Sequence, residues 1–127
     1  RMARKVLPTE VPMKDAIFNI GRASMLVAAL TRGNERYLRL GLDDALHQPY
    51  RAELIPGMYD VFKAARKAGA AGATLSGAGP CLIAYVLERR HAEEKVGQAM
   101  LEAFKKHDVE ARILTLDLDT HGAQILK

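Results

Sequence analysis

The chain has 127 residues, 49% hydrophobic and 27% charged, a balance typical of one globular domain with its own core. Its net charge of +4 comes from dispersed basic residues that do not alternate with aromatic ones, which argues against a nucleic-acid-binding surface. Neither a membrane-spanning apolar run nor a signal peptide is visible, so we expect no membrane partner. The single cysteine, Cys81, excludes an internal disulfide and is typical of the reducing cytoplasm.

The first half of the chain is predicted to be helical after an irregular segment over residues 1–12. Helical spacing of apolar residues predicts a helix over residues 13–31, whose inward face we expect to be Met13, Ile17, Ile20, Ser24, Val27 and Leu30. Gly33 and Asn34 separate it from a second helix over residues 35–46, with its apolar face at Leu38, Leu42 and Leu46. A break over residues 46–56 and a third helix over residues 57–68 follow.

The second half combines strands with one further helix. Short apolar runs at 74–75 and 82–87 predict two buried strands, and a fourth helix is expected over residues 91–107, with Val96, Met100, Ala103 and Phe104 inward. Alternating residues over 110–118 predict a third strand, and residues 123–126 a short fourth one. The order predicts an α+β fold: a ferredoxin-like split βαβ unit with a four-stranded antiparallel sheet and helices on one face.

A glycine-rich corner lies between the first two predicted strands, at Ser76, Gly77, Ala78, Gly79 and Pro80. Glycines allow a positive φ at this turn, and its backbone N–H groups could hold an anion. The residues alone leave two interpretations open, a tight structural turn and a ligand loop.

The standard catalytic patterns do not fit this corner. Leu82 stands where a dinucleotide fingerprint needs its third glycine, and Ala78 stands where a phosphate-binding P-loop needs lysine. Ser76 is not in a nucleophile elbow. The four histidines are far apart in sequence, so no metal site is expected.

Two arginines outside the predicted helices are candidate anion ligands. Arg4 lies in the irregular N-terminal segment, and Arg51 follows Pro49 in the break between helices. A guanidinium presented from a stiffened loop can bind a carboxylate or phosphate through two parallel hydrogen bonds. A surface salt bridge is the alternative role for Arg51.

The stretch from Gly72 to Pro80 resembles the third conserved motif of the GHMP small-molecule kinases. Two further stretches resemble the homoserine kinases within that superfamily: residues 1–8 with Val11 and Pro12, and residues 46–51 with residues 54–57. The likeness extends over essentially the whole chain. It implies ATP- and Mg²⁺-dependent phosphorylation of L-homoserine to O-phospho-L-homoserine in threonine biosynthesis.

The resemblance also implies roles for the candidate residues. Arg4 and Arg51 match arginines that bind the carboxylate of the substrate, and Ser76 to Pro80 match a loop that supports the phosphate loop and lines the substrate pocket. The N-terminal ATP-binding domain of these kinases has no counterpart in the sequence. We therefore expect an isolated C-terminal domain over residues 1–127 that binds no cofactor and is inactive alone.

Two alternatives remain open at this stage. The chain could belong to another GHMP kinase, or it could be a non-catalytic ferredoxin-like module that binds a small ligand or forms dimers. The expected partners are L-homoserine and the missing N-terminal domain, with a homodimer left open.

Overall fold

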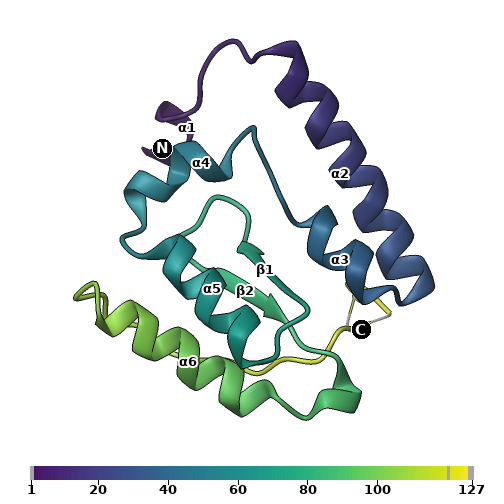
Figure 1. Ribbon diagram of the computed structural model, residues 1–127, viewed down its shortest axis with the longest axis vertical. Helices are drawn as coiled ribbons and strands as arrows, with labels where there is room; N and C mark the ends of the chain where they lie inside the picture. Colours follow the sequence, from purple (N-terminus) through teal and green to yellow (C-terminus); the bar gives the residue numbers. More distant parts are fainter. Residues whose placement is uncertain (1, 120, 126–127) are drawn as a thin grey trace.

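A computed structural model describes residues 2–119 and 121–125. Six α-helices and two strands are assigned within these residues, together with the short 3₁₀ helices η1 and η2. Their bounds in chain order are α1 (Met2–Lys5), α2 (Met13–Arg32), α3 (Glu35–Gly41), α4 (Gln48–Arg51), η1 (Ala52–Leu54), α5 (Met58–Ala68), β1 (Gly72–Leu75), β2 (Leu82–Tyr85), η2 (Glu88–Arg90) and α6 (Glu93–Lys105) (Figure 1).

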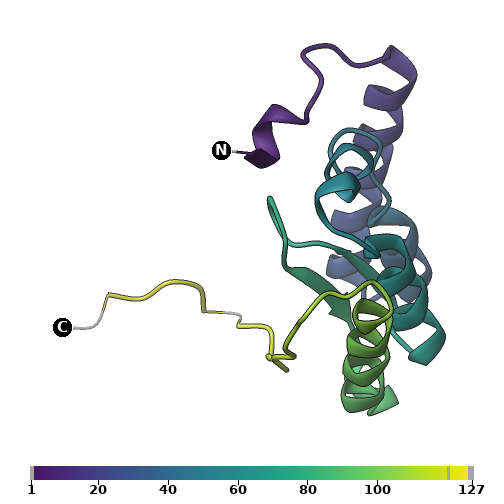
Figure 2. The same ribbon diagram turned by 90° about the vertical axis from the view of Figure 1, so that its left-hand side faces the viewer.

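The sheet is a single antiparallel hairpin. β1 pairs with β2 from Gly72 opposite Tyr85 to Leu75 opposite Leu82, so the glycine corner connects the two strands directly. Figure 2 shows the helices on one side of this hairpin, and α1 and the C-terminal segment projecting on the other side. The α+β class is therefore as predicted.

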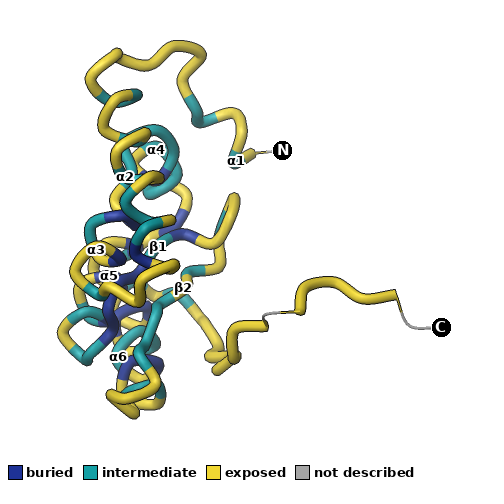
Figure 3. The backbone as a smooth tube through the Cα atoms, turned by 90° about the vertical axis from the view of Figure 1, so that its right-hand side faces the viewer, coloured by how far each residue is buried: buried dark blue, intermediate teal, exposed yellow. Residues whose placement is uncertain are grey.

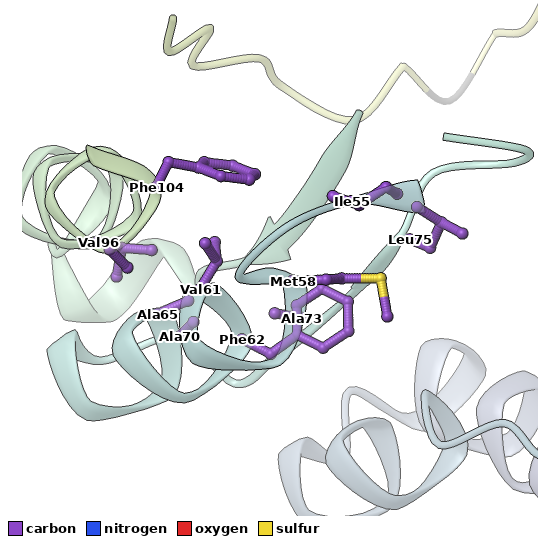
Figure 4. Packing of buried hydrophobic residues seen from close by; sticks show 11 residues of the cluster. Ile55, Met58, Val61, Phe62, Ala65, Ala70, Ala73, Leu75, Val96 and Phe104 are labelled. Carbon is purple, nitrogen blue, oxygen red and sulfur yellow. The ribbon is translucent and has the colours of Figure 1, made fainter. Parts of the chain in front are cut away.

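The main core lies where α5 packs between α6 and the hairpin. Met58, Val61 and Ala65 of α5 are fully buried, and Phe62 on the same face is nearly so. Figure 4 shows this face directed toward Val96 and Phe104 of α6 on one side and toward Leu75 of β1 on the other. The inward residues predicted for the fourth helix are confirmed, with Met100 at the edge of the cluster.

The inward face predicted for the first helix is wrong. Met13, Ile17, Ile20, Val27 and Leu30 are all more than half exposed, and Ser24 is exposed as well. The helix itself is confirmed as α2, and its only fully buried residue is Ala29. Periodicity reveals that a helix has an apolar face, but it does not reveal what covers that face.

The segment between the second and third helices also differs from the prediction. α3 ends at Gly41, well before residue 46, and the predicted break contains the short helix α4 followed by η1. Pro49 is tolerated there because it occupies the first turn of α4, where its missing N–H has no helical partner. Residues 2–5, expected to be irregular, form α1.

The two C-terminal strands are not observed in the described part of the chain. Residues 110–119 have no regular structure and are exposed throughout; residues 126–127 lie outside the described residues (Figure 3). Leu114, Leu116 and Leu118 are 66–81% exposed. Because a strand persists only with a partner strand and a surface for its apolar side, the alternating pattern alone does not form one here. Within the described residues the sheet therefore has two strands in place of the four predicted.

Candidate functional site

The glycine corner is a tight turn built from positive-φ glycines. Gly77 has φ 57° and Gly79 has φ 82°, and the Gly79–Pro80 peptide is cis. The backbone N–H of Ser76 donates to the carbonyl of Cys81 at 2.9 Å, and that of Gly79 donates to the carbonyl of Ser76 at 3.1 Å. A Cβ on Gly79 would lie 2.9 Å from both Ile55 and Leu75, so the turn packs against the core at this residue.

Arg51 connects this corner to the N-terminal segment. Its Nη1 donates to the carbonyl of Gly77 at 2.9 Å, and its Nε donates to the carbonyl of Ala3 at 3.2 Å. The three stretches singled out in the sequence, around residues 4, 51 and 77, therefore meet at one guanidinium. Among the residues that the structure describes, the contacts of Arg51 are to these two backbone carbonyls and to His47, and no carboxylate lies within salt-bridge distance of it.

Asp44 anchors the helix that carries Arg51. Its carboxylate accepts hydrogen bonds from the backbone N–H groups of His47 (2.8 Å) and Gln48 (2.6 Å) at the start of α4, and from the Asn19 amide of α2 (2.7 Å). Burial opposes ionisation of this carboxyl, but these hydrogen bonds outweigh it and lower the pKa of Asp44.

His47 lies between this carboxylate and Arg51. Its Nε2 is 3.5 Å from Oδ1 of Asp44, and its Nδ1 is 3.3 Å from Nη1 of Arg51. A neutral imidazole with its proton on Nε2 could direct that proton toward Asp44 and accept from Arg51 through Nδ1. The guanidinium is thus held on several sides by fixed groups.

Gln48 links the start of α4, where Asp44 and His47 lie, to the sheet. It is 5% exposed, its Nε2 donates to the carbonyl of Leu42, and its Oε1 accepts from the backbone N–H of Leu75 at the end of β1. The end of α3, the start of α4 and the end of β1, next to the glycine corner, therefore share one set of hydrogen bonds. Because these bonds satisfy the amide, its burial is tolerated.

Arg4 lies on α1, one residue beyond the carbonyl that Arg51 contacts, and it is exposed. The structure thus places Arg4 and Arg51 on neighbouring segments, both on short helices instead of the loops expected. The fixed loop geometry inferred from Pro49 is replaced by a capped helical turn.

Two hollows of the chain involve residues of this framework or of α5. One of about 270 Å³ is lined by Asp44, Gln48, Tyr59 and Arg66 among others. Another of about 220 Å³ is lined in part by Asp60 and His107, whose side chains are 2.8 Å apart. Burial raises the pKa of Tyr59, and the charge of Asp44 adds to this. Arg4, Arg51 and the glycine corner line neither of these two hollows.

Asn19, Asp44, His47 and Gln48 were missed as parts of the site. Asp44 carries a usable signal, since an aspartate just before a proline-containing helical turn is a common cap. Asn19 and Gln48 carry no such signal, because the residues that they contact are 25 to 27 positions away in sequence.

Among the described residues, no group of three or more His, Cys, Asp or Glu side chains could hold a metal ion. No helix of the described part is long and apolar enough to span a membrane.

Comparison with known proteins adds a family and its relatives. A family model described as GHMP kinases C terminal matches residues 25–110. The chain is 45% identical over 126 residues to the homoserine kinase of Moorella thermoacetica, covering 99% of this chain and 42% of that protein. The chain is also 47% identical over 122 residues to the homoserine kinase of Nostoc punctiforme, covering 96% of this chain and 40% of that protein.

A solved structure of a homoserine kinase is also similar to this chain. The crystal structure of homoserine kinase from Cytophaga hutchinsonii matches with a TM-score of 0.75 and 36% sequence identity, over 83% of this chain and 33% of that chain. The chain spans about two fifths of the length of the curated relatives named above.

Proposed function

Because this chain belongs to the family of GHMP kinase C-terminal domains, we propose that it is the substrate-side domain of a homoserine kinase. The parent enzyme transfers the γ-phosphoryl group of ATP to the hydroxyl of L-homoserine. The observation that carries the proposal is the meeting of three homoserine kinase-like segments at the Arg51 guanidinium. Such a transfer needs positioning and charge neutralisation more than a covalent protein partner, which suits a site built from arginines and a backbone turn.

Arg51 and Arg4 bind the substrate carboxylate in this proposal. The hydrogen bonds of Arg51 to described residues use its Nε and Nη1, so we assign its Nη2 to the substrate carboxylate. Arg4 adds a second positive charge from α1. The carbonyls of Ala3 and Gly77 hold the guanidinium plane before substrate arrives, which reduces the ordering cost of binding.

The glycine corner supports the phosphate-binding part of the enzyme in this proposal. Ser76, Gly77, Ala78 and Pro80 are exposed and lie beside Arg51, so another domain could contact them. ATP and Mg²⁺ are assigned to the remainder of the longer protein, since the described residues offer neither a P-loop nor a carboxylate cluster. Residues 110–118 form a strand that completes the ferredoxin-like sheet when that remainder is present. The enzyme works in the cytoplasm.

The test compares the 127-residue chain with the longer protein that contains it. We expect the longer protein to form O-phosphohomoserine from ATP, Mg²⁺ and L-homoserine, and to leave mevalonate and galactose unphosphorylated. The isolated chain is expected to form no product. Phosphorylation of mevalonate in place of homoserine would assign the chain to another GHMP kinase, and activity of the isolated chain would refute the division of labour.

A further inference from the structure

The guanidinium of Arg51 is held by acceptors from three parts of the chain. Its Nε donates to the carbonyl of Ala3 at 3.2 Å, and its Nη1 donates to the carbonyl of Gly77 at 2.9 Å. Nδ1 of His47 lies 3.3 Å from the same Nη1. Nη1 carries two protons, so it donates to the carbonyl and to the imidazole at once. Both protons of Nη2 are left without an acceptor among the described residues.

His47 is the acceptor that belongs to the same short helix as Arg51. It is the N-cap residue of α4 and precedes Arg51 by four residues, so the two side chains leave the helix on the same face. The backbone N–H of Arg51 donates to the carbonyl of His47 at 3.0 Å, which fixes the spacing of the two residues. Ala3 and Gly77 lie on other segments, α1 and the glycine corner (Figure 1). The imidazole is therefore the contact that depends least on other segments.

The chemistry of arginine fixes the protonation state of this imidazole. A guanidinium only donates hydrogen bonds, so the ring nitrogen that faces it carries no proton. Nδ1 is therefore the acceptor, and the ring proton is on Nε2. Nε2 lies 3.5 Å from Oδ1 of Asp44, whose side chain is 6% exposed and whose lowered pKa keeps it ionised at neutral pH. A negative charge on that side of the ring favours the proton on Nε2.

The imidazole also separates two opposite charges. Asp44 lies on one side of the ring and Arg51 on the other, and among the described residues no carboxylate lies within salt-bridge distance of Arg51. Because its acceptors are all uncharged, the guanidinium is held in position while its positive charge stays available. A carboxylate in the place of His47 would also hold the guanidinium, but its negative charge would compete with that of a carboxylate ligand.

We propose that His47 is a positioning residue for homoserine binding, whose neutral imidazole holds the Arg51 guanidinium and keeps it from pairing with Asp44. This inference rests on the proposed function, in which Arg51 binds the substrate carboxylate through Nη2. His47 acts through Arg51 and touches no substrate. Because the carboxylate of homoserine is not the group that is phosphorylated, loss of His47 is expected to affect substrate binding and not the chemical step.

Three substitutions of His47 in the longer kinase separate the effects of acceptor, charge and volume. His47→Asn keeps a neutral oxygen acceptor near the place of Nδ1, so the Michaelis constant for homoserine is expected within about threefold of wild type. His47→Leu keeps a similar volume but has no acceptor, and it should raise that constant about tenfold. His47→Asp is equal in size to the asparagine variant and should raise it further, because its carboxylate pairs with Arg51. The turnover number and the Michaelis constant for ATP should change less than about twofold.

His107→Leu is the matched control. His107 also lies beside a carboxylate, with its Nε2 2.8 Å from Oδ2 of Asp60, but its ring makes no hydrogen bond to an arginine among the described residues. This variant should leave the Michaelis constant for homoserine unchanged. Circular dichroism and thermal unfolding show whether each variant is folded. If His47→Leu is not, the comparison of His47→Asn with His47→Asp decides, because these side chains are equal in size.

Nitrogen NMR of the 127-residue chain tests the state of the ring separately from any activity. The ring signals of His47 are those that are absent from the spectrum of His47→Asn. They are expected to show an unprotonated Nδ1 and a protonated Nε2 at neutral pH. A protonated Nδ1 would refute the proposal, whatever reaction the longer protein catalyses.

The kinetic outcomes distinguish this proposal from the proposed function. A homoserine kinase in which His47→Leu and His47→Asp keep the wild-type Michaelis constant would refute the role of His47 alone. A lower constant for His47→Leu than for His47→Asn would show that His47 only fills space, and would also refute it. A wild-type longer protein that does not phosphorylate homoserine would refute the proposed function, and with it the substrate assigned to Arg51, while the NMR measurement still decides whether the imidazole accepts from Arg51.

Discussion

At the scale of single residues, Arg51 has the most consequential contacts in the chain. Its guanidinium joins the carbonyls of Ala3 and Gly77 and is proposed to bind the substrate carboxylate. In the longer kinase, Arg51→Ala is expected to weaken homoserine binding by about 2–4 kcal/mol, the cost of losing a charge-assisted pair. The Michaelis constant for homoserine should rise while that for ATP stays near wild type.

The controls for this prediction come from the same residue type. Arg51→Lys keeps the charge but cannot reach two carbonyls with a planar fork, so it is expected to rescue binding only in part. Arg36→Ala removes an exposed arginine of α3 and should leave both constants unchanged. Loss of ATP affinity in place of homoserine affinity would contradict the assigned role.

Asp44 makes the stability of the fold depend on pH. Its pKa is lowered in the folded chain, so the ionised form stabilises the fold fully above the ordinary carboxyl pKa, and this stabilisation is lost as the pH falls through the lowered pKa. Asp44→Ala is expected to lower the free energy of unfolding by about 1–3 kcal/mol at neutral pH. In urea unfolding experiments, the difference in the free energy of unfolding between wild type and Asp44→Ala should narrow below about pH 4.

Asp43 provides the matched control. It is the adjacent carboxylate and is exposed. Asp43→Ala should change the free energy of unfolding little at any pH, and an equal effect of both variants would show that general surface charge is responsible.

The two glycines of the corner are expected to differ in their tolerance of a side chain. Gly79→Ala adds a Cβ 2.9 Å from Ile55 and Leu75 at a φ of 82°, so steric and backbone strain combine. Gly77→Ala meets nothing within 4 Å and carries only the backbone strain, about 1–2 kcal/mol. Thermal unfolding should therefore rank the chains as wild type, Gly77→Ala and Gly79→Ala in order of decreasing stability.

At the scale of elements, α2 and α5 show what a helical pattern does and does not predict. Both were identified from apolar spacing, and the bounds of α5 agree with the prediction to one residue. The buried face of α5 is large and apolar, whereas α2 is held by Ala29, Leu26 and the polar anchor Asn19. Sequence spacing alone could not have chosen the inner face of α2, because the stripe with the stronger apolar pattern lies outside.

This contrast predicts unequal costs for equivalent truncations. Val61→Ala empties space in the centre of the core and is expected to lower the free energy of unfolding by about 2 kcal/mol. Ile17→Ala removes more atoms but from a side chain that is 62% exposed, so it should cost less than about 0.5 kcal/mol. Urea unfolding of the two variants and of wild type measures both costs.

The candidate site was predictable where a residue type carries its own signal. The glycine corner and Arg51 stood out because positive φ and a guanidinium near a proline are local features. Their support by Asn19 and Gln48 was not predictable, since it depends on hydrogen bonds between residues far apart in sequence. The residues found from the sequence are those proposed to touch ligand, and the residues missed are those that hold them.

At the scale of the whole molecule, the chain builds a main core around α5 and a smaller cluster between α2 and α3, but it does not form the strand predicted over residues 110–118. The strand pattern over residues 110–118 is not formed, although Ile113 packs closely over Gly97 of α6 and keeps the segment near the domain. The fold class was therefore predictable and the number of strands was not, because an alternating pattern does not say whether a partner strand lies beside it.

This incomplete sheet has a measurable consequence. In the isolated chain the backbone amides of residues 114–118 are expected to exchange with deuterium as fast as an unfolded peptide. In the longer protein the same amides should become protected by at least about tenfold. Amides of α5 should be protected equally in both, which controls for overall stability. Unprotected amides in the longer protein would exclude a strand at this segment.

The position of Cys81 makes the corner convenient for spectroscopy. It is the single cysteine of the chain, it is exposed, and it follows Pro80 directly. A fluorophore attached there needs no engineered thiol, and it lies at the end of the turn that Arg51 contacts through Gly77. Its emission could therefore report the arrival of homoserine, or of the remainder of the enzyme, in real time.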